Sequence, residues 1–155
     1  MRSLRPSPQA AARELLKRRA ARSRLIDFAR YIEVPGAPLD GDDSDEFARA
    51  ETQLARHHEL ILDAAQRCID RPNGRLMLFM PPGSAKSTYG SVVVPTWAMG
   101  QTPGYRVIAV SYGSDLAVKF GRKARAVVRQ PAFGALFGTE LSGDSSAADM
   151  WALAN

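Results

Sequence analysis

The 155-residue sequence has a single cysteine, Cys68, and lacks any long apolar run. One thiol cannot form a disulfide within the chain, which favours a reduced, cytosolic setting. No stretch approaches the roughly 18 apolar residues that a membrane-spanning helix needs. The amino terminus is basic, but it has no apolar segment of the kind that a secretory signal peptide carries. These absences predict a cytoplasmic protein that does not enter a membrane.

Acidic residues are scarce at the amino-terminal end. Residues 1–30 contain nine lysines and arginines against Glu14 and Asp27, whereas residues 31–155 contain 12 basic and 14 acidic residues. The net charge of +5 therefore belongs to an amino-terminal arm and not to the whole chain. Such an arm can contact nucleic acid or an acidic protein, or it can be an ordinary solvated helix face.

Apolar residues at helical spacing predict three helices, which run from about Pro8 to Ile32, from about Glu46 to Ile69 and from Ser114 onward. Prolines and a glycine between Pro35 and Pro38 end the first helix, and an acidic turn follows at Asp40–Asp45. This break is the predicted boundary between residues 1–38, a basic helical arm with a linker, and the main body, residues 39–155.

Two short apolar runs, Leu76–Met80 and Val107–Val110, predict buried β-strands because strands covered on both faces are continuously apolar. A helix is predicted between them, from Lys86 to about Met99, with a kink or an end at Pro95. Another helix follows the second run. The order strand, helix, strand, helix favours an α/β fold, with a parallel sheet and flanking helices.

The segment Met80-Pro-Pro-Gly-Ser-Ala-Lys-Ser-Thr88 has the residue types of a phosphate-binding loop. A triphosphate needs converging backbone N–H groups, a cation on its β- and γ-oxygens and a hydroxyl for Mg²⁺. Lys86 can supply the cation and Ser87 the Mg²⁺ ligand, at the positive end of the helix that follows. The predicted nucleotide-binding residues are Gly83, Ser84, Ala85, Lys86, Ser87 and Thr88.

The match to the pattern G-x-x-x-x-G-K-[ST] is incomplete, because Met80 and Ala85 stand where the pattern has glycine. Alanine at position 85 fits only if its φ is negative, since glycine alone adopts positive φ without strain. The competing interpretation is an ordinary Pro-Gly turn followed by the polar start of a helix.

From Arg75 to Tyr89 the sequence resembles the Walker A segment of large terminase subunits, the motors that package DNA in tailed phages and prophages. The resemblance covers about residues 50–155, and its further parts are His57-His58, Pro95-Thr-Trp97, Ser111-Tyr-Gly113 and Phe120-Gly-Arg122. It implies a P-loop NTPase-like fold with ATP and Mg²⁺ as cofactors. The implied partners are double-stranded DNA, portal protein and the small terminase subunit, with assembly into a homo-oligomeric ring in the cytoplasm of a bacterial host.

A Walker B motif, an apolar strand that ends in Asp with Glu beside it, is missing. Val107–Val110 ends in Ser111, and neither Asp144 nor Asp149 follows an apolar strand. The resemblance places this motif and a nuclease domain beyond Asn155. We therefore expect the ATP-binding part of a packaging motor, incomplete on its carboxy-terminal side and inactive as an ATPase by itself. The alternatives are an unrelated small P-loop kinase and a non-catalytic nucleotide-binding or docking module from a truncated prophage gene.

Arg122, Arg125 and Arg129 lie, with two lysines, on one broad face of the helix that starts at Ser114. This face can be simply solvated, can contact DNA phosphates, or can send an arginine to the ATP of a neighbouring subunit. His57 and His58 are adjacent on a helix and point about 100° apart, so a shared metal site is not expected. One of these two histidines is expected to pack toward the core or near the adenine of the nucleotide.

Overall fold

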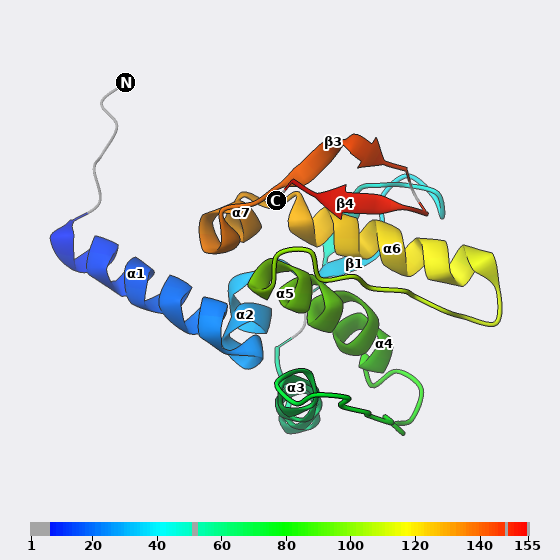
Figure 1. Cartoon of the computed structure of the whole chain (residues 1–155), viewed down its shortest axis with the longest axis horizontal. Helices are drawn as coiled ribbons and strands as arrows, with labels where there is room; N and C mark the ends of the chain where they lie inside the picture. The colour runs from blue at the N-terminus through cyan, green and yellow to red at the C-terminus, as the bar shows by residue number, and fades with distance from the viewer. Residues whose placement is uncertain (1–6, 51–52, 148, 155) are drawn as a thin grey trace.

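The computed structural model describes residues 7–50, 53–147 and 149–154, and it is mostly helical (Figure 1). The helices are α1 (Pro8–Ser23), α2 (Leu25–Tyr31), α3 (Arg56–Ile69), α4 (Lys86–Thr88), α5 (Val94–Gln101), α6 (Ser114–Val128) and α7 (Pro131–Phe137), and a π-helical turn, η1 (Tyr89–Val93), joins α4 to α5. The strands are β1 (Pro35–Pro38), β2 (Phe47–Arg49), β3 (Leu141–Ser146) and β4 (Trp151–Leu153). Within these described residues, no helix combines the length and apolarity needed to cross a lipid bilayer.

The expected α/β fold, with its P-loop NTPase-like parallel sheet, is wrong. The described residues contain two antiparallel pairs, β1 with β2 and β3 with β4, and no parallel pair. Leu76–Met80 and Val107–Val110 run as irregular traces outside both sheets (Figure 1). A strand forms only where a second backbone accepts and donates its hydrogen bonds, and neither run is paired with one in the described part of the chain.

Two helix boundaries also differ from the prediction. The helix expected from Pro8 to Ile32 is divided at Arg24, whose extended backbone (φ −128°) ends α1 and begins α2. The helix expected from Glu46 begins only at Arg56, because Phe47–Arg49 pairs with β1 as β2. The spacing of apolar residues before Arg56 matches a helix, but the pairing with β1 decides the local structure.

The helix predicted after Lys86 is confirmed and continues through Pro95 to Gln101. Proline has no N–H to donate back along the helix, and the π-helical turn η1 precedes it, with the Val94 N–H bonded to the Tyr89 carbonyl. The Thr96 hydroxyl donates to the Val92 carbonyl at 2.9 Å inside the core. Helical structure therefore continues past Pro95, where the sequence predicts a kink or an end, and the loop that follows α3 leads into its amino-terminal end (Figure 1).

The core is formed by the helices, with η1 in contact with both α3 and α6. Its fully buried side chains include Phe28 of α2, Leu62 of α3, Val92 of η1, Val127 of α6 and Phe133 of α7. Burial of side chains of this size contributes roughly 1.5–3 kcal/mol each. This packing fixes the helix that begins at Lys86 and, with it, the loop before that helix.

Candidate nucleotide-binding site

The loop Met80–Thr88 curves around a hollow of about 460 Å³ that is lined by the loop's own residues. Its backbone is left-handed at Gly83 (φ 79°) and at Ala85 (φ 53°). Left-handed residues next to right-handed ones turn successive N–H groups to the same side, which makes an anion-binding concavity. The first N–H groups of the helix from Lys86 have no partner within the helix, and they carry its positive end. The loop therefore has the shape that an anion site needs.

Lys86 and Ser87 stand in the first turn of this helix, with Lys86 half-buried and Ser87 exposed. The structure thus brings together the predicted residues Gly83 to Thr88 around one hollow. Their binding of ATP and Mg²⁺ stays a prediction. In the described chain, no three His, Cys, Asp or Glu side chains cluster to hold a metal. Ser87 would therefore share Mg²⁺ with phosphate oxygens and water, the ligands that this ion commonly keeps.

The expectation that alanine fits at position 85 only with a negative φ is wrong, because the φ of Ala85 is +53°. For a residue with a side chain, a left-handed conformation costs about 1–2 kcal/mol. Such strain persists only where the surroundings hold the backbone in place. The Ala85 carbonyl accepts from the Tyr89 N–H at 3.1 Å, and the preceding residue, Ser84, is held by a contact from α3.

His58 makes that contact. Its Nδ1 accepts from the N–H of Ala55 at 3.1 Å, and its Nε2 lies 3.1 Å from the carbonyl oxygen of Ser84. An accepting Nδ1 leaves the proton on Nε2, which then donates to Ser84. Burial lowers the pKa of His58, the charge on His57 adds to the shift, and the bond to Ser84 opposes it. His58 is thus a neutral histidine that is buried against the loop, as was expected for one of the pair, whereas His57 is exposed.

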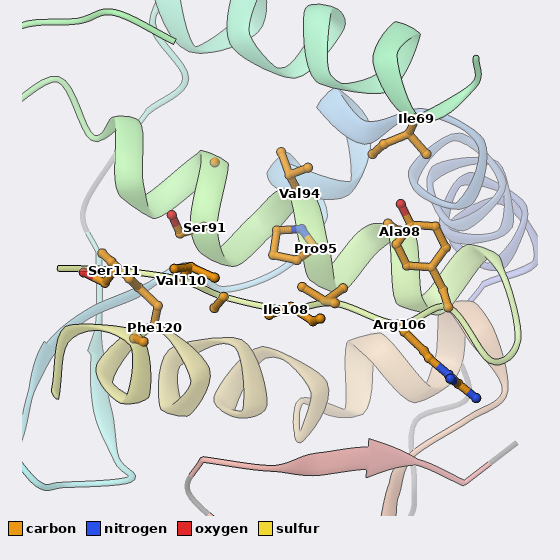
Figure 2. Close-up of a pocket in the computed structure, with 15 residues that line it drawn as sticks. Ile69, Ser91, Val94, Pro95, Ala98, Arg106, Ile108, Val110, Ser111 and Phe120 are labelled. Carbon is orange, nitrogen blue, oxygen red and sulfur yellow. The ribbon is translucent and has the colours of Figure 1, made fainter. Parts of the chain in front are cut away.

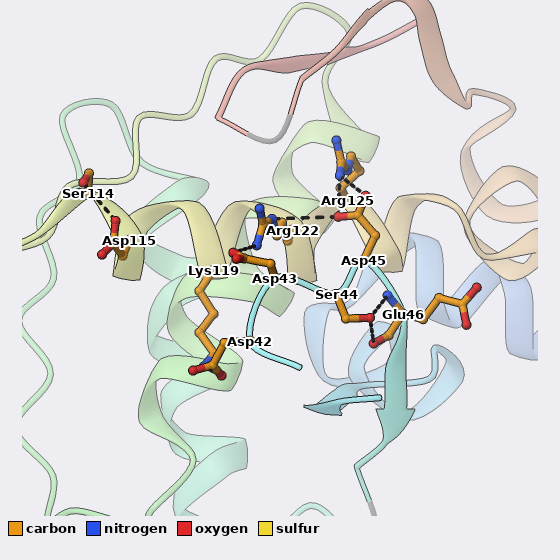
Figure 3. Close-up of polar contacts among 10 residues, drawn as sticks. All are labelled: Asp42, Asp43, Ser44, Asp45, Glu46, Ser114, Asp115, Lys119, Arg122 and Arg125. Carbon is orange, nitrogen blue, oxygen red and sulfur yellow. Dashed lines mark hydrogen bonds and ion pairs between the residues drawn. The ribbon is translucent and has the colours of Figure 1, made fainter. Parts of the chain in front are cut away.

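The basic face of α6 meets the acidic turn between β1 and β2 (Figure 3). The three shortest ion pairs between them are Lys119–Asp42 at 2.8 Å, Arg122–Asp43 at 2.7 Å and Arg125–Asp45 at 2.6 Å. Both halves are visible in the sequence, but their pairing is not, because about 80 residues separate them. The matched order of three aspartates and three basic residues is the signal that could have revealed it.

The three arginines of this face are not equivalent. Arg125 is 3% exposed and belongs to the fold, while Arg129 is exposed and lies 3.9 Å from Asp45. Arg122 pairs with Asp43, whose side chain is 97% exposed, so solvent and salt weaken that pair. The contacts predicted for Arg122, Arg125 and Arg129, to DNA or to the ATP of a neighbouring subunit, stay predictions.

A second hollow, also of about 460 Å³, lies between the η1–α5 helix, α6 and the segment from Tyr105 to Ser111 (Figure 2). Val94, Ile108 and Phe120 are among its apolar lining residues, and Tyr105 and Arg106 are the ionisable ones. It has no carboxylate, histidine or thiol to act as an acid, base or nucleophile. Most of its lining residues are apolar.

Comparison with protein-family models, with curated proteins and with solved structures finds no match for this chain.

Proposed function

We propose that the chain binds a nucleoside triphosphate as its magnesium complex, with the phosphates held by the loop from Gly83 to Thr88. The observation that carries this proposal is that the loop lines an open hollow directly before the helix that begins at Lys86. An ordinary Pro-Gly turn would not need a second left-handed position two residues after the glycine, at an alanine.

Each part of the loop has a role in this proposal. Backbone N–H groups of Ala85 to Thr88 donate to phosphate oxygens, and the positive end of the helix favours the anion. The ammonium group of Lys86 adds charge-assisted hydrogen bonds, which are about twice as strong as neutral ones. The Ser87 hydroxyl contributes one ligand to Mg²⁺.

Titration of the chain with ATP and Mg²⁺, followed by calorimetry, tests this function. Lys86→Ala should abolish measurable ATP binding and leave the helical circular dichroism unchanged. Lys17→Ala removes an equally charged, exposed side chain from α1 and serves as the matched control. Equal ATP affinity of Lys86→Ala and the parent chain would refute the assignment.

We further propose that this loop serves a DNA-packaging motor of the large-terminase kind in the cytoplasm of a bacterial host. The support is the ordered resemblance from Arg75 to Arg122, together with the basic arm formed by residues 1–30. Portal protein, the small terminase subunit and double-stranded DNA are the proposed partners. Co-purification with a portal protein would support the proposal, and its failure with intact portal rings would count against it.

A specific observation favours a second candidate, a non-catalytic docking module. Ile108, Val110 and Tyr112 alternate along one segment and are 86%, 87% and 98% exposed, and Phe79 is 83% exposed. Such side chains mark surfaces that contact another polypeptide. Absence of ATP binding by the parent chain, combined with capture of a portal or small-subunit protein, would favour this candidate over nucleotide binding.

A further inference from the structure

We propose that His58 is the positioning residue of the phosphate-binding loop: its imidazole holds the Ser84 carbonyl and thereby aims the next N–H group at the bound phosphate. This inference rests on the proposed function for the identity of its ligand. Its geometry, however, is a contact between α3 and a loop 26 residues further along the chain.

The orientation of the imidazole ring is fixed from both of its nitrogens. The N–H of Ala55 donates to Nδ1, while the N–H of His58 donates to the carbonyl of Ala55 at 2.9 Å, so the two residues are bonded reciprocally at the start of α3. Ala55 has no side-chain oxygen to cap this helix, and the imidazole takes over part of that role. Nε2–H is left to donate in one direction only, to Ser84.

The consequence for the loop follows from the planarity of the peptide group. In a trans peptide, the carbonyl and the following N–H point in opposite directions. Because the Ser84 carbonyl points at His58, the N–H of Ala85 points away from α3. Ala85 is also the residue that is held left-handed, at φ 53°. One hydrogen bond from His58 therefore orients the first N–H donor of the anion concavity.

The imidazole is anchored to the core as well as to the loop. It lies 4.5 Å from the ring of Tyr89, and Tyr89 is 1% exposed in the helix that follows the loop. His58 therefore links α3, the loop and that helix at a single point. A loop that is already held in its binding conformation loses less entropy when the ligand binds, which raises affinity.

Three variants test this role, with the affinity for ATP and Mg²⁺ as the readout. His58→Phe keeps a ring against Tyr89 but removes both nitrogens, and we expect about tenfold weaker binding, the equivalent of one lost hydrogen bond. His58→Gln restores one donor and one acceptor and should recover part of the loss. His57→Phe changes the exposed neighbour and should bind ATP as the parent chain does.

The outcomes separate this inference from the proposed function. Normal affinity in His58→Phe, with binding abolished by Lys86→Ala, would overturn the inference and leave the function standing. Absence of ATP binding by the parent chain would remove the function instead. The role of His58 is then decided by ¹⁵N nuclear magnetic resonance. A proton on Nε2 in the parent chain supports the role. So does a single set of amide signals for residues 83–88 in the parent chain that becomes several sets in His58→Phe. A proton on Nδ1 in the parent chain overturns it.

Discussion

Replacing Gly83 with alanine isolates the contribution of left-handed backbone to the loop. Gly83 has φ +79°, and a Cβ added to it would meet no atom within 4 Å. A methyl group therefore has room, and the only cost is conformational. Gly143 also has open space around an added Cβ, but its φ is outside the left-handed region, so Gly143→Ala is the matched control.

The expected magnitude follows from two opposing terms. A left-handed alanine costs about 1–2 kcal/mol relative to the right-handed form. Alanine also makes the unfolded chain less flexible than glycine does, which returns about 0.4–1 kcal/mol. The net loss is about 1 kcal/mol, which corresponds to roughly fivefold in an equilibrium constant. If the loop is ordered without ATP, the loss lowers the free energy of unfolding; if it orders on binding, the loss weakens ATP affinity.

Urea unfolding and ATP titration should therefore be measured together on Gly83→Ala, Gly143→Ala and the parent chain. For Gly83→Ala we expect the losses in unfolding free energy and in ATP-binding free energy to add up to about 1 kcal/mol. For Gly143→Ala we expect neither loss. Ala85→Gly, at the other left-handed position, should change the same sum in the opposite direction because it relieves strain. If Gly83→Ala matched the parent in both measurements, the left-handed geometry of this loop would be refuted.

Three further predictions concern the whole chain. ATP hydrolysis should not exceed background, because the sequence has no Walker B motif to supply a carboxylate that orients the attacking water; a turnover of ~1 per second, as in well-equipped phosphoryl-transfer enzymes, would contradict this. The purified chain should self-associate in light scattering through the exposed side chains of Ile108 and Val110, and Ile108→Lys should reduce this; a monodisperse monomeric parent chain would argue against it. The lowered pKa of His58 means that the unfolded chain takes up a proton first, so the free energy of unfolding should be constant above pH 6.5, histidine's ordinary pKa, and fall as the pH drops below it. His58→Phe should flatten this dependence, and a gain in stability on acidification would contradict it.

The sequence predicted a helix correctly where the spacing of its apolar residues matches the face that packs against the core. Ser114–Val128 is a one-sided helix by sequence and in the structure, and the helix from Lys86 also appears where the sequence places it. The start of α3 was not predictable, because apolar spacing before Arg56 continues into a segment that pairs with β1. The periodic spacing of apolar residues indicates which side chains share one face of an element. It does not indicate which other segment of backbone is available for hydrogen bonding.

The sequence predicted which residues form the candidate site, but not the backbone conformation and the long-range contact that hold the loop in place. The positions of Lys86 and Ser87 follow from the motif. The left-handed φ of Ala85 does not, because an alanine in the sequence argues for negative φ. The contact from His58 to Ser84 joins segments that are 26 residues apart, and nothing in the local pattern marks it. Long-range contacts of this kind are decided by tertiary packing.

The run Leu76–Met80 leads into the proposed nucleotide-binding loop and carries the exposed side chain of Phe79. Phe79 is 83% exposed, and fully burying such a side chain is worth roughly 1.5–3 kcal/mol. A polypeptide that covered Phe79 would gain that amount. Phe79 directly precedes the loop that begins at Met80, while His58 restrains the same loop at Ser84. A partner that covered Leu76–Met80 would restrain the start of the loop, whose middle is already restrained at Ser84. A docked partner and a bound triphosphate should therefore each increase the affinity of the chain for the other.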